Sequence, residues 1–460
     1  MAPAGRFAGA EKTSRNGAIS VRRVGAALAL LVCGAAWGGQ LPEELFAKGL
    51  NLAEQISADE ARTRALSALA AAYAAHDPER ARAVAKNIPE GDLRWAALLA
   101  VVRGLAKRDP EAALALAEEL PDKFYQPFRS QALGAVAVAL APRDLNRAES
   151  LARSIPATTA RDRALADLAL AAVAVEPRRA ARIASRCSAP DVAARAMIAL
   201  LPVLAKRDRN AAQIAMVLAK RKLADVAEFL RWKLLAELVR AGAGADPERA
   251  ARYAEEVGDK QAQTLALGAA GAALAQVQDA KLRQRGGELF DRAADAARGL
   301  PPPENIAALA ELCPLAAKFD GNLAARLYAE AAKAASGQRG AARDAAFSAL
   351  AAHCATFSPA RALDAARNIA DPLLAARAFR VIAGQASDGG AARAALDAAA
   401  KRASKIADKK VRQATLAGLC GAWARISVNE ALALAEQTLK REGQVMAIAA
   451  ILNALAENAR

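Results

Sequence analysis

One stretch of this chain is nearly copied 32 residues further along. Residues 77–89 read DPERARAVAKNIP, and residues 109–121 read DPEAALALAEELP. Each copy begins with Asp-Pro, which is typical of a helix start. Asp accepts hydrogen bonds from the free N–H groups of the first turn, and Pro needs no partner at the first helical position. A chain that repeats one helix start at such an interval is built from stacked copies of one small unit.

Behind each start, apolar residues recur at i, i+3, i+4 and i+7, which places them on one helical face. The sets are Ala81, Val84, Ala85, Ile88; Ala113, Leu116, Ala117, Leu120; Ala148, Leu151, Ala152, Ile155; Ala180, Ile183, Ala184, Cys187; Ala250, Tyr253, Ala254, Val257; Ala324, Leu327, Tyr328, Ala331; and Ala362, Ala365, Ala366, Ile369. The pattern predicts helices that begin near residues 77, 109, 144, 176, 208, 246, 320 and 358. It also predicts that the large members Ile88, Leu120 and Ile155 are buried.

A second helix follows each first one, and an arginine recurs near its start. The recurring residues are Arg62, Arg94, Arg129, Arg161, Arg231, Arg343 and Arg412. A ladder of arginines along one face binds an acidic peptide or polymer in one interpretation. In the other, each arginine pairs with a carboxylate, as Arg94 would with Asp92 or Glu79. We favour the structural interpretation, because the helix dipole disfavours an unpaired cation at a helix N-terminus.

The repeating unit is therefore a helical hairpin of about 32 to 38 residues, which is too thin to bury its apolar stripe alone. Aromatic residues make up only 4% of the chain, and alanine, the strongest helix former, fills most apolar positions. The predicted fold is all-α: a right-handed α-solenoid of about twelve antiparallel helix pairs. It forms a single repeat domain over residues 41–460, and the unit around residues 280–313 is its least regular one.

This repeat resembles the tetratricopeptide and HEAT-type α-solenoid superfamily, and the resemblance extends over nearly all of residues 41–460. The chain is an Ala-rich relative, since the tetratricopeptide pattern of Trp, Leu-Gly, Tyr and Phe at set places is missing. The resemblance implies a protein-binding scaffold with a concave groove. It assigns no binding residue.

The first part of the chain has the order of a secretory signal peptide. Arg22 and Arg23 precede the apolar run VGAALALLV, and the small residues of Ala36-Trp37-Gly38 follow it. Residues 1–38 are the predicted signal region, and residues 1–20 are interpreted as a misassigned start before Val21. A lipoprotein at Cys33 is the weaker alternative. The run is shorter than the roughly 20 residues of a membrane span, so we expect an exported, periplasmic or extracellular protein with no integral membrane span.

The sequence contains little that suggests catalysis. Its two histidines, His76 and His353, belong to different repeats, and neither forms part of a metal-binding helix motif. No catalytic, cofactor-binding or metal-binding residue is predicted, and no cofactor is expected. One enzyme class does close helix pairs into an α/α toroid and cleaves glycosides with two carboxylates. The shortage of Trp and Tyr disfavours it, and Trp95 and Trp232 are predicted to pack in the core.

Four cysteines remain after the predicted signal, at positions 187, 313, 354 and 420. Equivalent helices of adjacent repeats lie about 8–10 Å apart, which exceeds the ~7 Å Cα separation that a disulfide tolerates. We therefore expect small buried core residues rather than disulfides. Cys313 and Cys354 are the pair in neighbouring repeats, so a bridge between them is the one alternative.

Positive charge is concentrated in one segment. The whole chain carries +16, and residues 178–222 hold eleven Lys or Arg against two Asp. The predicted anion-binding stripe comprises Arg178, Arg179, Arg182, Arg186, Lys206, Arg207, Arg209, Lys220, Arg221 and Lys222. The alternative is a solvated basic face. An acidic protein or an envelope polyanion suits this stripe, whereas nucleic acid does not, because no base-stacking aromatics lie among the cations.

Together these features predict an exported, non-catalytic repeat scaffold that binds a protein or peptide partner. An envelope assembly or structural component that contacts anionic glycans or lipids is the alternative. A toroidal glycoside hydrolase is the least favoured interpretation.

Overall fold

The computed structural model describes residues 40–123, 126–386 and 388–458. These residues form 24 helices, arranged as twelve outer and twelve inner helices. The outer helices are α2 (Gln40–Glu54), α4 (Pro78–Lys86), α6 (Pro110–Glu118), α8 (Leu145–Ser154), α10 (Pro177–Ser185), α12 (Arg209–Leu223), α14 (Pro247–Glu255), α16 (Ala280–Arg298), α18 (Gly321–Ser336), α20 (Pro359–Arg367), α22 (Gly389–Ala403) and α24 (Val428–Thr438). The inner helices are α3 (Asp59–Tyr73), α5 (Asp92–Ala106), α7 (Phe128–Leu140), α9 (Thr158–Ala172), α11 (Pro190–Arg207), α13 (Glu228–Gly242), α15 (Lys260–Leu274), α17 (Glu304–Ala316), α19 (Gly340–Cys354), α21 (Pro372–Gln385), α23 (Lys409–Ala424) and α25 (Arg441–Asn458).

The helix starts expected from the repeat are confirmed. All eight predicted positions are the N-cap residues of outer helices, and Asp77 accepts a hydrogen bond from the Arg80 N–H at 3.1 Å. The irregular unit is capped as well, because Asp279 accepts hydrogen bonds from the first turn of α16. Ile88, Leu120 and Ile155 are buried, as the apolar pattern predicts.

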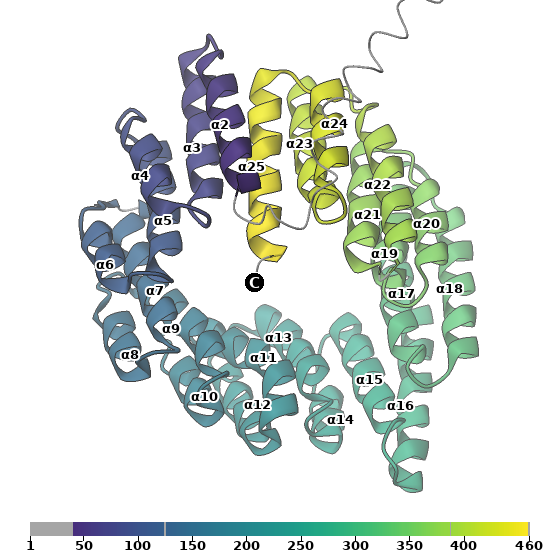
Figure 1. The fold of residues 1–460 in the computed structure, drawn as a ribbon. Coiled ribbons are helices and arrows are strands. Elements are labelled where there is room, and N and C mark those ends of the chain that lie inside the picture. Colours follow the sequence, from purple (N-terminus) through teal and green to yellow (C-terminus); the bar gives the residue numbers. More distant parts are fainter. Residues whose placement is uncertain (1–39, 124–125, 387, 459–460) are drawn as a thin grey trace, which may run out of the picture.

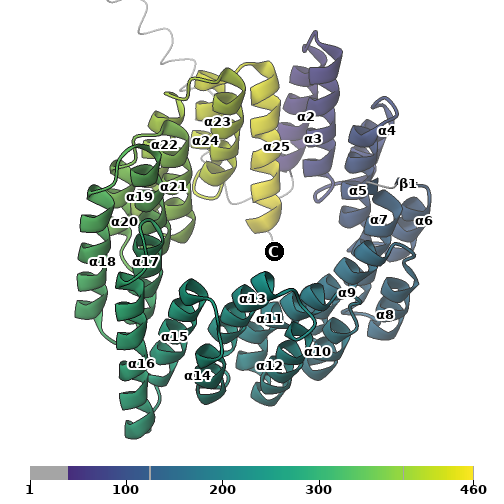
Figure 2. The same ribbon diagram turned by 180° about the vertical axis from the view of Figure 1, so that it is seen from behind.

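The helix pairs close into a ring (Figures 1 and 2), an arrangement that the sequence analysis considered only for the least favoured, hydrolase alternative. Each inner helix packs against the next inner helix, and α25 packs against α3 in the same way. Each outer helix lies between two inner helices: α4 contacts α3 and α5, and α2 contacts α25 and α3. The first and last pairs are therefore neighbours that repeat the contacts made everywhere else in the ring.

Polar contacts also join the two ends. Lys48 on α2 pairs with Glu436 on α24 at 2.6 Å, which continues the outer ladder of pairs such as Arg80–Glu43. Near the end of α3, the imidazole of His76 lies 2.9 Å from the carbonyl oxygen of Leu452 on α25. We call the contact of α2 and α3 with α24 and α25 the seam.

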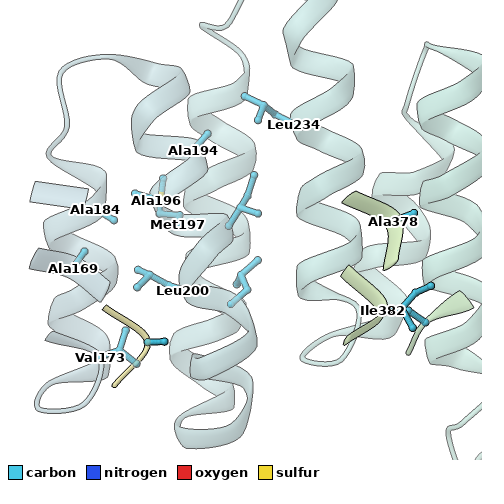
Figure 3. Packing of buried hydrophobic residues seen from close by; sticks show 14 of the residues in the cluster. Ala169, Val173, Ala184, Ala194, Ala196, Met197, Leu200, Leu234, Ala378 and Ile382 are labelled. Carbon is cyan, nitrogen blue, oxygen red and sulfur yellow. The ribbon is translucent and has the colours of Figure 1, made fainter. Parts of the chain in front are cut away.

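Alanine makes the close packing of this ring possible. Figure 3 shows Ala169 of α9, Ala184 of α10 and Ala194 of α11 together with the larger Met197 and Leu200. These five side chains are buried. Small side chains let helix axes approach closely, and the buried residues form one continuous cluster around the ring.

The recurring arginines have structural partners, but the expected type of partner is wrong for most of them. Arg129, Arg231 and Arg412 donate to the backbone carbonyl oxygens of Leu120, Val226 and Ile406, at 2.9, 3.1 and 2.7 Å. Arg161 does the same at the end of α8. These carbonyls close the preceding outer helix, where the last turn lacks N–H partners and the dipole favours a cation. A carboxylate is the partner of Arg62, which pairs with Asp59.

Two buried carboxylates fasten neighbouring repeats together. Asp162 on α9 accepts hydrogen bonds from the Ser188 and Ala189 N–H groups, both at 2.8 Å, just before α11 begins. Asp344 on α19 holds the loop before α21 in the same way. A carboxylate that accepts hydrogen bonds from two N–H groups has its negative charge stabilised, and it satisfies two buried donors at the same time.

Strand structure in the described residues is limited to one short antiparallel ladder, β1 (Asp122–Lys123) with β2 (Gln126–Pro127). It lies between α6 and α7. The Asp122 carboxylate accepts hydrogen bonds from the N–H and hydroxyl groups of Ser130, so it also caps the start of α7.

All four described cysteines are free and buried, as expected. The Cys187 thiol lies 3.4 Å from the carbonyl oxygen of Asp162. Burial raises the pKa of Cys187 and of Cys420 to about 12, which keeps both thiols protonated at neutral pH. Cys354 raises the pKa of Cys313, and burial adds to this effect, so these two thiols lie in one electrostatic environment.

No described helix is long and apolar enough to cross a membrane. The predicted signal region, residues 1–38, and the lipoprotein candidate Cys33 lie outside the described residues.

Candidate functional site

Eight of the ten residues of the predicted basic stripe lie on the adjacent outer helices α10 and α12 or at the C-terminal end of α10, and Lys206 and Arg207 end the inner helix α11 between them. Arg178 pairs with Asp208 at 3.2 Å, and Lys220 pairs with Glu256 at 2.5 Å. Arg207 and Arg209 donate to the backbone carbonyls of Ala174 and Ala245. Arg179 and Arg186 both pair with Glu149 on α8.

Six of the ten cations thus have a partner within the protein. Among the described residues, the exceptions are Arg182, Lys206, Arg221 and Lys222. Arg178, Arg182 and Arg186 therefore do not form a uniform unpaired stripe, because interactions between repeats neutralise the first and the third. Within this row, Arg182 is the residue whose guanidinium remains available to bind a molecule outside the protein.

A second surface is the inner wall of the ring. The resemblance implied a concave groove, but none of the residues of this wall was predicted as a binding residue. An inner helix is flanked by two inner neighbours and backed by outer helices, so residues exposed along its middle face the centre of the ring. On α9 these residues are Arg163, Asp167 and Leu170, at i, i+4 and i+7. On α13 they include Glu237 and Arg240.

The inner wall carries more cations than anions. Its exposed cations along the middle of the inner helices are Arg103, Arg163, Arg195, Lys233, Arg240, Arg377 and Arg380. The corresponding carboxylates are Asp167, Glu237 and the half-buried Glu311. Exposed apolar side chains lie among these charges: Leu93, Leu170, Val203, Phe229, Val381 and Met446. Phe229, at the start of α13, is 75% exposed.

The inner wall contains a cavity of about 840 Å³ between α11, α13, α15 and α17. Its lining includes small residues from successive helices, among them Ala199, Ala241, Ala269, Ala272 and Ala273. Because none of these side chains extends beyond Cβ, the wall is hollowed where the helices approach closely. We call this space the inner-wall cavity.

Charged and polar groups surround the small residues of the cavity. Glu237, Arg240, Gln276 and Lys318 line it, and Leu315 adds an apolar contact. Arg240 also forms an ion pair with Glu311 on α17 at 2.5 Å. Since α15 lies between α13 and α17 in the inner ring, this ion pair bridges one helix.

The charges of this ion pair act on His353 of α19. Burial lowers the pKa of His353, while Glu311 opposes the shift and Arg240 adds to it. The imidazole is therefore neutral at pH 7. Its ring is a hydrogen-bonding group beside the charged pair.

A second charged group on the inner wall joins α5 to α9. Burial in the concave wall lowers the pKa of Arg103, and repulsion from Arg163 lowers it further, while Asp167 opposes the shift. Burial raises the pKa of the Asp167 carboxyl, against the attraction of both arginines. Like charges are thus held close together on this wall, which favours a negatively charged partner.

Sequence reasoning missed the inner wall because exposure on an inner helix and exposure on an outer helix give the same pattern of polar residues. The signal that was present is the arginine or lysine in the middle of second helices, as in Arg163 and Arg240. Within the described part of the chain, no group of three or more His, Cys, Asp or Glu residues is placed to hold a metal ion.

Comparisons with known proteins add little to this picture. No family model matches the chain, and no curated protein matches it. One similar solved structure is a circular tandem repeat protein with novel repeat topology and enhanced subunit contact surfaces. It shares 16% sequence identity over 91% of this chain and 98% of its own, with a TM-score of 0.16. A TM-score this low does not establish a shared fold. The chain is a helical repeat protein on the evidence of its own twelve helix pairs.

Proposed function

We propose that this protein is an exported, non-catalytic repeat scaffold that binds an acidic segment of a protein or peptide on the inner wall of its ring. The observation that carries the proposal is the inner-wall cavity. Its small-residue surface admits side chains, and Arg240 and Lys318 at its border attract carboxylates. Exposed apolar groups on the same wall, such as Val203 and Phe229, add contact area for a peptide. The proposal includes kinship with tetratricopeptide and HEAT-type scaffolds.

A filled cavity is expected to stop peptide binding. Ala273 lines the cavity and is half-buried, so Ala273→Trp should occupy the space without disturbing the core. We expect an array of acidic peptides that contain aromatic residues to bind the unmodified protein. Binding of the same peptides to Ala273→Trp should be at least about tenfold weaker, because the lost contact area corresponds to more than 1.4 kcal/mol.

Ala394→Trp is the matched control, since Ala394 is exposed on the outer helix α22. It should leave peptide binding unchanged. Fluorescence polarisation with the best peptide from the array measures both variants. Equal affinity of the two variants would move the binding site away from the inner wall, and failure of every acidic peptide to bind would contradict the proposal.

The export part of the proposal rests on the residues around Arg22 and Arg23 and the apolar run that follows them. N-terminal sequencing of protein recovered from the periplasm or the medium is expected to show a chain that begins close after Trp37. An intact Met1 in the mature protein would contradict export by this signal.

The closed ring is the one observation that favours the hydrolase alternative. A glycoside hydrolase needs two available carboxylates at its cleft. Near the inner-wall cavity, Glu311 is already paired with Arg240. Among the described residues that line the cavity, none is aromatic, so sugar rings lack a stacking surface. The binding scaffold is for these reasons the better supported function.

A further inference from the structure

We propose that a groove between the outer helices α8 and α10 is a second binding site, which takes a phosphate-type oxyanion with at least two negative charges. The groove has a volume of about 790 Å³ and lies on the outside of the ring, away from the inner-wall cavity. Four arginines line it: Arg153 from α8, and Arg179, Arg182 and Arg186 from α10 and its C-terminal end. One carboxylate, Glu149, lies among them.

Both oxygens of this carboxylate, Glu149, already pair with arginines. Arg179 contacts Glu149 Oε2 through Nη2 at 3.0 Å and through Nε at 3.2 Å. Arg186 pairs with the other oxygen, Oε1. The Glu149 side chain is only 8% exposed, so its two oxygens have no room for a further cation. In the described structure, Arg153 and Arg182 therefore have no ion-pair partner.

Two other junctions between outer helices do not share this excess. Arg147 pairs with Glu111 one-to-one, and Arg298 pairs with both Glu330 and Asp295. Helix α10 reads PRRAARIAS and contains no acidic residue, whereas the equivalent helix α14 reads PERAARYAE. The junction of α8 and α10 is thus enriched in arginine beyond what packing of the ring requires.

The remaining lining residues favour a small polar ligand over a peptide. Asn146, Ser150 and Ser154 surround the arginines, and Ile183 is the apolar residue among the described lining. An acidic peptide would leave its apolar side chains without a pocket here. Guanidinium groups match phosphate oxygens two at a time, so a diphosphate or a phosphate ester fits the arginines and the hydroxyl groups.

Titration calorimetry at low ionic strength with inorganic pyrophosphate tests this site on the full mature chain. Saturable binding is expected, and added sodium chloride should weaken it, because salt screens exposed charges. Arg182→Gln and Arg153→Gln should each weaken binding about tenfold, because each removes charge-assisted hydrogen bonds to the anion. Arg179 and Arg186 are left unchanged, since their loss would leave Glu149 buried without a partner.

Arg252→Gln supplies the matched control. Arg252 occupies the same place in α14 that Arg182 occupies in α10, but acidic residues Glu255 and Glu256 follow it. This variant should bind pyrophosphate as the unmodified protein does. Ala273→Trp should also leave pyrophosphate binding intact, so a failure of the peptide proposal and a failure of this one are distinguishable.

Sedimentation with vesicles of phosphatidylcholine and phosphatidic acid, whose phosphomonoester can carry two negative charges, separates two sources of the phosphate. Vesicle binding that Arg153→Gln with Arg182→Gln abolishes would assign the groove to a lipid headgroup. Pyrophosphate binding without vesicle binding would assign it to a soluble phosphate. An affinity for pyrophosphate that the double variant leaves unchanged, or the absence of saturable binding, would overturn the proposal.

Discussion

Gly286→Ala is expected to lower the free energy of unfolding by about 3 kcal/mol, because one added methyl group has no room between α15 and α16. A Cβ at Gly286 would lie 2.4 Å from the Ala275 nitrogen and 2.8 Å from the Gly271 carbonyl oxygen. Both contacts are with backbone atoms, which cannot rotate away as a flexible side chain can. The two helices must separate to accept the substitution.

The next residue in the chain gives the control. Gly287 lies in the same helix, and a Cβ there would have no heavy atom within 4 Å. Gly287→Ala should therefore raise the free energy of unfolding by about 0.5–1 kcal/mol, the ordinary gain of alanine over glycine inside a helix. Urea denaturation followed by circular dichroism measures both. Similar effects of the two substitutions would show that α15 and α16 do not approach as closely as described.

Ile448→Ala is expected to destabilise the protein by about 3 kcal/mol and also to open the ring at the seam. Ile448 is buried on α25, and its Cγ2 lies 3.4 Å from where a Cβ on Gly49 of α2 would be. Loss of this side chain leaves a cavity between the first and last helix pairs. Because loops connect all other neighbouring pairs and none connects these, the seam is the contact that can separate without unfolding a helix pair.

Ile382→Ala separates opening from general destabilisation. Ile382 is buried on α21, within the continuous part of the chain (Figure 3). The substitution Ile382→Ala should lower the free energy of unfolding by a similar amount but leave the seam closed. Spin labels at Glu54→Cys on α2 and Gln437→Cys on α24 report the separation by double electron–electron resonance. A broadened, longer distance is expected for Ile448→Ala alone. Unchanged distances in that variant would show that the ring stays closed without this contact.

The outer helices are the elements that local sequence determined most completely. Asp77, Asp109 and Asp144 cap the helices they were predicted to start, because capping depends on residues within one turn of each other. The spacing of apolar residues likewise predicted the burial of Ile88 and Leu120, since a helix with 3.6 residues per turn places them on one face. The burial of Cys187 follows from the same periodicity.

The partners of the arginines were decided by packing. The sequence shows that Arg129 and Arg231 recur at a helix start, but many oxygen atoms lie within reach of so long a side chain. Only the angle between an outer helix and the next inner one brings the carbonyl oxygens of Leu120 and Val226 to those guanidinium groups. The sharing of Glu149 by Arg179 and Arg186, and hence the charge left on Arg182, depends in the same way on how α8 and α10 lie together.

Ring closure and the inner-wall cavity depended on the tertiary structure alone. The sequence determined that hairpins form and stack, because each has an apolar face that only a neighbour can cover. Whether twelve stacked pairs form an open superhelix or a ring depends on a small rotation between neighbours, repeated at every junction. No local sequence pattern specifies the total of these rotations. This total brings Lys48 and Glu436 together, although 388 positions of the chain separate them. Closure also turns one exposed stripe of every inner helix toward a common centre. On this wall Arg240 and Glu311 pair across the intervening helix α15.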